Sequence, residues 1–257
     1  MKSLNFRHFF TACFLLAALG LASGAEIQSA RKSLLSLPQR VVIPKLHGPL
    51  VLNGNLNEKV WAQAAILSPF LLNGSAKPAR EKTSVRIWYD DSALYLGWTC
   101  NDTDIQATLT ARDSQLWDEE VVEFFVAPKR LDRYFELQWN PVGGVFDAKI
   151  KNKINRSGFS KKIIGDPKFT AKGMSSAVQV RGSVNKSNSK DKMWQVEVAI
   201  PFAALNEGTP KPKAIWRANL YRYSRTKGLP LELLSWSPTL MPGFHEPTRF
   251  GYLEFGE

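Results

Sequence analysis

The strongest constraint on the fold is a series of short β-like runs separated by turn signals. Apolar and β-branched residues are concentrated at residues 83–90, 93–100, 121–127, 134–139, 178–184, 194–200, 214–223 and 250–255. Turn sequences such as Asn-Gly-Asn at 53–55 and Pro-Gly at 242–243 lie between the runs, and no long helical period occurs. This pattern predicts an all-β fold: a single β-sandwich, jelly-roll or immunoglobulin-like and mostly antiparallel, with at most short helical turns.

Two segments, 57–65 and 201–205, have the composition of short helical turns. In the first, Asn57 can cap the turn and Trp61 lies on its apolar side. We expect Trp61 to be buried in the core, and we expect the same of Trp139 and Trp236.

The first 25 residues have the pattern of a secretory signal peptide. Lys2 and Arg7 precede or flank the start of an apolar stretch at 9–21, and small residues follow it. We therefore expect a signal peptide at 1–25, an irregular lead-in at 26–40 and one domain at 41–257. The product is expected to be secreted or periplasmic, without a transmembrane segment. Cys100 is then the only thiol, so the fold cannot depend on an internal disulfide.

Basic residues are concentrated in one part of the chain. The formal net charge is +11 at pH 7, and Asp166 is the only acid within residues 149–172. We expect a solvated, basic loop face there. The alternative is a surface that attracts an anionic glycan or the cell envelope. Nucleic acid is not an expected partner, because the chain has an export signal and no recognisable nucleic-acid motif.

The run WDEEVVEFFV at residues 117–126 carries the clearest functional signal. A pyranose has apolar C–H faces that pack on an aromatic ring, and hydroxyls that need fixed hydrogen-bond partners. Trp117 supplies a ring, and carboxylates follow it at the start of an otherwise apolar strand. The run therefore indicates sugar binding.

Strand alternation places Glu123 on the same face as Val121 and Phe125. A carboxylate with apolar neighbours needs an Arg, an amide, a metal or a ligand hydroxyl to satisfy its oxygens. From the strand alone, an internal salt bridge is the favoured interpretation and a ligand is the alternative.

Five segments, taken in order, resemble the family 9 carbohydrate-binding modules first met in bacterial xylanases, within a wider group of β-sandwich domains that bind sugars or haem. They are LNGNLNEKVW at 52–61, VRIWYDDSALYL at 85–96, the run at 117–126, WQVEVAIPF at 194–202, and SWSP at 235–238 followed by FHEPTRFGYL at 244–253. The resemblance covers the chain from about Val41 to its end.

The resemblance implies a sugar ring held between Trp117 and Phe244, where Phe244 replaces the usual Trp of the family. It implies that Glu123 accepts hydrogen bonds from sugar hydroxyls, and that Gln138 and Asn140 stand where the family has an Arg and an Asn. An uncharged amide cannot make the charge-assisted bonds of an Arg, so the sugar and its affinity stay open. Family members also hold structural calcium, whose ligands the resemblance does not locate here.

Glu120 and His245 complete the candidate sugar site. Glu120 is one of the carboxylates that follow Trp117. His245 follows Phe244 and can donate to a hydroxyl, or form a salt-linked turn with Glu246.

The residues themselves support parts of this site. Gln138 and Glu136 share one face of their strand, so an amide and a carboxylate are displayed together. Phe244 follows Pro242 and Gly243 in a loop, where an exposed ring is more often functional. The alternative is that the ring of Phe244 folds back onto the sandwich.

We thus predict non-catalytic carbohydrate binding, in support of polysaccharide recognition or catabolism, with an oligosaccharide or polysaccharide as ligand. A glycoside hydrolase is one alternative, because paired carboxylates are its machinery. Glu120 and Glu123 are three residues apart on a strand, however, so they project to opposite faces.

Haem binding and a scaffold role are also compatible with the sequence. A haem-binding domain could use His245 with Met174, Met193 or Met241, although the chain has no Cys-x-x-Cys-His motif. An envelope scaffold or protein-interaction module would need no ligand, and such a role predicts that Trp117 is buried.

Overall fold

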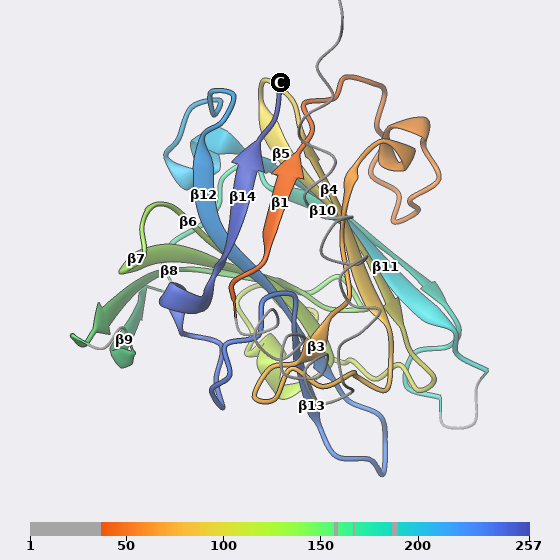
Figure 1. Ribbon diagram of the computed structural model, residues 1–257. Coiled ribbons are helices and arrows are strands. Elements are labelled where there is room, and N and C mark those ends of the chain that lie inside the picture. The colour runs from red at the N-terminus through yellow and green to blue at the C-terminus, as the bar shows by residue number, and fades with distance from the viewer. Residues whose placement is uncertain (1–36, 157–158, 167, 187–189) are drawn as a thin grey trace, which may run out of the picture. The chain divides into compact units, whose positions relative to one another are not determined.

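The short runs form two β-sheets in the computed structural model, which describes residues 37–156, 159–166, 168–186 and 190–257 (Figure 1). Residues Pro38–Glu257 form one compact unit. The larger sheet follows the order β1 (Arg40–Ile43), β14 (Gly251–Phe255), β12 (Ile215–Ser224), β6 (Val121–Arg130), β7 (Arg133–Trp139), β8 (Val145–Ile154) and β9 (Ser160–Asp166). Two short strands extend it, β13 (Glu232–Ser235) on β12 and β3 (Leu71–Leu72) on β13.

The smaller sheet has the order β10 (Ser175–Arg181), β11 (Met193–Pro201), β5 (Ala93–Asn101), β4 (Thr83–Tyr89) and β2 (Ala65–Leu67). Neighbouring strands pair antiparallel in both sheets, apart from β1, which pairs parallel with β14 and lies beside it in Figure 1. The predicted all-β, mostly antiparallel sandwich is confirmed.

Alternation along the strands builds the core between the sheets. On β6, Val122, Phe124 and Val126 pack in one apolar cluster with Trp98 of β5 and Trp194 of β11, all fully buried. Side chains that are two residues apart share a face, so each central strand of a sheet contributes every second side chain to this cluster. Trp139 and Trp236 belong to the same cluster, as predicted.

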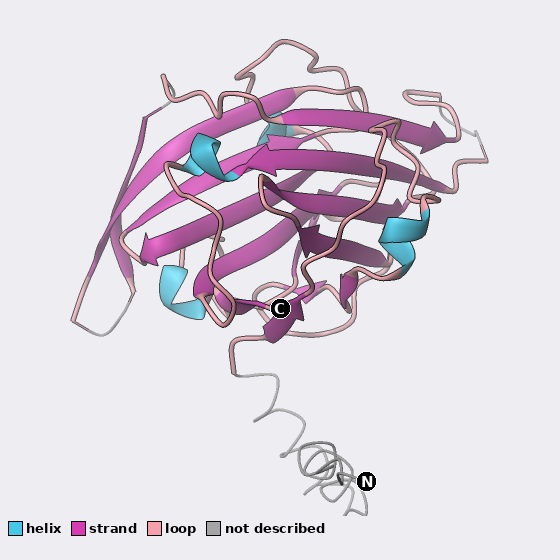
Figure 2. Cartoon of the chain, turned by 90° about the horizontal axis from the view of Figure 1, so that it is seen from above, coloured by secondary structure: helices cyan, strands magenta, loops and turns pink. Residues whose placement is uncertain are grey.

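Within the described residues, helical structure is limited to short 3₁₀ turns around the margins of the sheets (Figure 2). η2 (Lys59–Ala62) and η4 (Phe202–Leu205) fall within the two predicted helical turns, and η3 (Leu116–Asp118) and η5 (Pro247–Arg249) were not predicted. Trp61 on η2 is fully buried and donates its indole N–H to Glu197 Oε1 at 2.8 Å. It packs in the core, as expected.

The basic segment is a correction to the predicted loop face, because most of it forms β8 and β9. Lys149, Lys151 and Lys153 are exposed, and they alternate along β8 with the buried Ile150 and Asn152. The lysines lie on one face of a strand whose other face is buried, which is the alternation expected of a half-exposed β-strand. Because one of its faces is charged, this strand contains fewer apolar residues than the runs that the sequence analysis identified as strands.

The predicted signal peptide at 1–25 and most of the predicted lead-in at 26–40 lie outside the described residues. β1 begins at Arg40, one residue before the predicted start of the domain. Among the residues that the structure describes, no helix is long and apolar enough to cross a membrane.

A buried ion network ties the two sheets together. Arg222 of β12 is fully buried and donates to Glu120 Oε1 at 2.7 Å and to Asp102 Oδ2 at 2.9 Å. It also donates to Thr83 Oγ1 of β4 at 3.1 Å and to the Asn101 carbonyl of β5 at 2.9 Å. One guanidinium of the larger sheet therefore satisfies groups at the ends of two strands of the smaller sheet.

Replacing Arg222 by Leu should destabilise the protein by about 3–5 kcal/mol, because Glu120 and Asp102 would be left as unpaired buried carboxylates. Urea unfolding followed by tryptophan fluorescence measures the free energy of unfolding. Arg40→Leu is the control, since Arg40 forms a half-exposed pair with Glu254 at 2.8 Å and its loss should cost about 1 kcal/mol or less. Equal losses in the two variants would contradict a linking role for Arg222.

Candidate functional site

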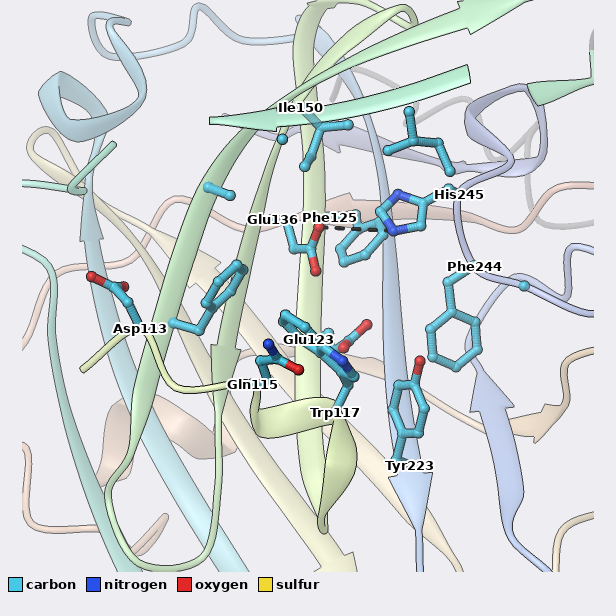
Figure 3. Close-up of a pocket in the computed structure, with 15 residues that line it drawn as sticks. Asp113, Gln115, Trp117, Glu123, Phe125, Glu136, Ile150, Tyr223, Phe244 and His245 are labelled. Atoms are coloured by element: carbon cyan, nitrogen blue, oxygen red, sulfur yellow. Dashed lines mark ion pairs between the residues drawn. The ribbon is translucent and has the colours of Figure 1, made fainter. Parts of the chain in front are cut away.

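A pocket of about 560 Å³ lies on the face of the larger sheet that is turned away from the smaller one (Figure 3). Its walls come from the segment before β6, from β6, β7, β8, β9 and β12, and from residues 243–245 of the loop between β13 and η5. The residues that line it are Asp113, Gln115, Trp117, Glu123, Phe125, Glu136, Phe146, Ala148, Ile150, Ile163, Gly165, Tyr223, Gly243, Phe244 and His245.

The floor of the pocket is the second face of the strands that build the core. Val121 and Phe125 pack in an apolar cluster separate from the one between the sheets, and Glu123 lies between them in sequence on the same face. Across β6 and β7, Phe125 is opposite Glu136 and Glu123 is opposite Gln138. Strand register therefore brings two carboxylates to one apolar floor.

Trp117 forms one wall and is half-buried. Its ring meets the Phe146 ring edge to face, with centroids 5.2 Å apart and planes at 89°. The Arg225 guanidinium donates to the Trp117 carbonyl at 2.9 Å and to the Glu119 carbonyl at 3.1 Å, which fixes the η3 turn. Trp117 is thus held in place while part of its ring stays exposed, contrary to the burial expected of a scaffold.

Phe244 forms another wall and is 4% exposed. Its ring stacks on Tyr221 at 4.0 Å and 13°, and it meets the Tyr223 ring at 5.2 Å and 79°. The Tyr221 hydroxyl donates to the Phe244 carbonyl at 2.9 Å. The ring of Phe244 therefore folds back onto the sheet, and it still lines the pocket.

Glu123 is 2% exposed and makes no hydrogen bond or ion pair within the described residues. The favoured internal salt bridge is therefore wrong. Gln138, opposite Glu123, donates instead to Glu136 Oε1 at 2.6 Å. Burial, reinforced by the charge of Glu136, holds the pKa of Glu123 well above its usual value. In Figure 3, the Glu123 carboxylate lies between Trp117 and Phe244.

Glu136 is the second carboxylate of the pocket, and the site predicted from the sequence did not include it. Burial raises its pKa to about 7, against the hydrogen bond from Gln138, which favours the ionised form. His245 Nε2 lies 3.9 Å from Glu136 Oε2, beyond hydrogen-bonding distance.

His245 is held in one orientation by the strands beneath it. Its Nδ1 lies 2.7 Å from the Tyr134 hydroxyl oxygen, which accepts at 3.4 Å from the Asn152 amide. The Tyr134 hydroxyl proton is then directed to Nδ1, so we assign the ring proton to Nε2, on the pocket side. Burial lowers the pKa of His245 to about 4, and the ring is neutral at pH 7.

The structure brings four predicted site residues to the pocket, namely Trp117, Glu123, Phe244 and His245, and it does not bring Gln138, Asn140 or Glu120 there. Gln138 is fully buried beside Glu136 on β7. Direct sugar contacts by these three residues stay a prediction.

Asn140 and Glu120 have partners within the protein. The Asn140 amide donates to the Leu109 carbonyl at 2.7 Å and accepts from the Gly144 N–H at 2.7 Å, which closes the turn between β7 and β8. Glu120 accepts from Arg222 and from the Arg225 backbone N–H. Both side chains therefore maintain local structure.

Tyr223 and Glu136 are the principal pocket residues that sequence reasoning missed. Tyr223 alternates with Arg222 on β12 and so shares a face with Tyr221. Glu136 shares a face with Gln138, a pattern that was visible in the sequence. The sequence does not show that β6 pairs with β7 and β12, and this pairing brings the pocket-side faces of the three strands together.

No group of three or more His, Cys, Asp or Glu side chains that could hold a metal ion is found within the described residues. The structural calcium implied by the family resemblance has no such side-chain cluster in that part of the chain.

An open pocket lined by aromatic rings and a few buried hydrogen-bond acceptors, on one face of a β-sandwich, is typical of domains that bind small molecules. The model of the carbohydrate-binding family 9 matches residues 58–255, and the chain belongs to this family. A search of curated proteins finds no match.

Solved structures share the fold at low sequence identity. A proposed carbohydrate-binding protein from Bacteroides uniformis ATCC 8492 has a TM-score of 0.64 at 19% identity, over 85% of this chain and 99% of that one. A family 9 module from Caldicellulosiruptor kristjanssonii in complex with cellotriose has a TM-score of 0.56 at 13% identity, over 85% and 94% of the two chains. A family 9 module from the same organism in complex with glucose has a TM-score of 0.56 at 12% identity, over 84% and 97%.

Glu136→Gln should stabilise the free protein at pH 7 by on the order of 1 kcal/mol, because it removes a carboxyl group that must ionise in a buried site and keeps the acceptor for Gln138. The folded carboxyl group has the higher pKa, so wild-type stability falls as the pH rises from about 4.5 to about 7. The advantage of the variant should therefore grow across this window and vanish below it.

Urea midpoints of both proteins between pH 4 and pH 8 measure this effect. Glu254→Gln, which alters an exposed carboxylate on β14, should show no such pH-dependent gain. A constant difference between Glu136→Gln and wild type at all pH values would contradict the assignment to the carboxyl pair.

Proposed function

We propose that the pocket binds a sugar ring, stacked against Trp117 and Phe244, with hydroxyl groups bonded to Glu123. The observation that carries this proposal is a partly exposed Trp117 beside a buried Glu123 that has no donor among the described residues. Aromatic rings cover the apolar face of a pyranose, and hydroxyls supply the donors that the carboxylate lacks. A ligand would thus complete the hydrogen bonding of the free protein.

The other polar groups divide between direct and indirect roles. Glu136 and the Nε2–H of His245 offer an acceptor and a donor to the same ring. Gln138 acts through Glu136, whose carboxylate it orients. Asn140 keeps the β7–β8 turn closed, and Glu120 holds the segment that carries Trp117.

We propose that the protein binds without catalysis. A glycosidase needs two carboxyl groups whose environments separate their pKa values, so that one is an acid and the other an ionised base or nucleophile. Burial raises the pKa values of both Glu123 and Glu136. Both pKa values are therefore shifted in the same direction, and no Lys or Arg among the described lining residues would hold either carboxyl ionised as a base or nucleophile, so binding is the better assignment.

Haem is a poorer fit to the same pocket. His245 is the one histidine among the described residues that line it, and no methionine is among them. Two acidic side chains on the floor would meet the apolar face of a porphyrin. A sugar uses these groups, whereas haem would leave them unsatisfied.

We propose that the protein works outside the cytoplasm in polysaccharide recognition or catabolism. The signal-like segment at 1–25 supports export. Relatives by fold were solved with cellotriose and with glucose, so glucose-based oligosaccharides are the first ligands to test. Calcium remains a proposal from the family resemblance alone, and titrations with and without a chelator test it.

The Trp117→Ala variant should lose at least tenfold in sugar affinity, because it removes the exposed stacking surface and disturbs the core little. A disaccharide of about 23 heavy atoms at roughly 0.3 kcal/mol per atom gives a dissociation constant on the order of 10 μM. Calorimetric titration with mono- and oligosaccharides measures both values.

Tyr252→Ala is the matched control, since Tyr252 is a half-buried aromatic residue on β14, away from the pocket residues. It should bind sugar like the wild type. Phe244→Ala is less suitable, because Phe244 is buried against Tyr221 and its loss should also destabilise the fold. A folded wild-type protein that binds no sugar would refute the proposed function.

We propose a second, weaker surface for anionic glycans or the cell envelope on the opposite face of β8 and β9. There Arg133, Lys149 and Lys151 line a cavity of about 370 Å³, in which Asp166 is the only acid among the described residues. Lys153 and Lys162 pair across the two strands and add to the charge. Several exposed cations with few acids attract polyanions at low salt.

Replacing Lys151 and Lys153 together by Glu should lower the salt concentration at which the protein elutes from a sulfated polysaccharide column. The pair Lys82→Glu and Lys211→Glu changes the same net charge at other exposed positions. Equal shifts for the two double variants would show a general charge effect and no specific surface.

A further inference from the structure

The sugar pocket is acidic, and the donors on its lining residues, such as Gln115 and Tyr223, are uncharged. Asp113, Glu123 and Glu136 line it, and none of the lining residues in the described chain is Lys or Arg. His245 is neutral at pH 7 and supplies a single N–H. The lysines of β8 stand on the other face of the strand, so they do not neutralise the pocket.

Two buried acceptors have no hydrogen-bond donor within the described residues of the free protein. Glu123 is 2% exposed, lines the pocket and has no hydrogen bond within the described residues. Gln138 Oε1 is buried and also has no partner in that part of the chain. Buried carboxylates are normally compensated by a cation, and Gln138 has only an uncharged amide to offer. Of the two acceptors, only Glu123 lines the pocket, so its compensation is left to the ligand.

We propose that the ligand of this pocket is an amino sugar, whose ammonium group binds Glu123 and Glu136 while its ring packs on Trp117. This inference rests on the sugar-binding role proposed above. An ammonium group supplies three N–H donors and a positive charge, and it can serve both carboxylates at once. A neutral sugar supplies hydroxyl donors but brings no positive charge to favour the ionised form of the two carboxyl groups.

The aromatic surroundings suit the same group. Phe125, Tyr223 and Phe244 line the pocket together with Trp117, and Glu123 lies among them (Figure 3). The faces of aromatic rings attract cations, and a desolvated setting strengthens the attraction. An N-acetylated sugar has the same ring without the charge, so it separates charge recognition from fit.

Calorimetry at pH 7 with the full chain tests this inference, with glucosamine and its β-1,4 disaccharide as probes. Glucose, cellobiose and the N-acetylated disaccharide are the uncharged counterparts. We expect the amino sugars to bind about tenfold or more tighter than the uncharged ones, and we expect added NaCl to reduce the difference. Each charge-assisted bond is worth about a factor of ten, which sets this expectation.

Glu123→Gln and Glu136→Gln should remove most of this preference: each should weaken binding of the amino sugars much more than binding of the uncharged sugars, whose hydroxyls also lose a charged acceptor. Glu254→Gln makes the same charge change on β14 and should keep the preference. Thermal unfolding of each variant checks that it is folded. Equal affinity for charged and uncharged sugars, or a preference for the uncharged ones, would overturn the inference and leave sugar binding intact. A folded protein that binds none of these sugars would overturn both proposals.

Discussion

Burial of β6 on both faces is the constraint on which the rest of the structure depends. Every residue from Val121 to Ala127 is buried, although the strand belongs to a sandwich with only two sheets in the described chain. One face packs against the smaller sheet. The other must be covered by loops and aromatic side chains, because an open apolar face of this size would be unfavourable in water. The pocket is the part of that cover which stays incomplete, and Glu123 lies on its floor.

The fold was accessible from the sequence where apolar alternation was dense. β4, β5, β6 and β7 were located to within a few residues, because each of these strands carries at least one face of buried apolar side chains. β8 and β9 were missed, since their lysines gave the composition of a loop. The short strands β1, β2, β3 and β13 are two to four residues long, which is too short for any periodic signal.

The candidate site was only partly accessible, for a different physical reason. Trp117 and Glu123 lie on one short run, so local alternation sufficed to select them. Glu136 and Tyr223 enter the pocket through strand pairing, which joins residues far apart in sequence. Asn140 has an amide side chain of the kind that often binds ligands, but here that amide closes a turn. Composition alone cannot distinguish an amide that serves the backbone from one that serves a ligand.

The ion network between the sheets also explains why Glu120 matters without touching the pocket. Its carboxylate accepts from Arg222, which spans the sheets, and from the backbone N–H of Arg225. The Arg225 guanidinium in turn donates to the Trp117 carbonyl. A chain of buried and half-buried hydrogen bonds thus connects the packing of the two sheets to the position of the exposed ring. Such support limits the motion of Trp117, so little conformational entropy is lost when a ligand packs on it. The neighbouring Glu123 carboxylate, in contrast, has no hydrogen-bond partner among the described residues. A pocket that holds a fixed aromatic ring beside an unsatisfied acceptor is arranged for a ligand that packs on the ring and donates to the carboxylate.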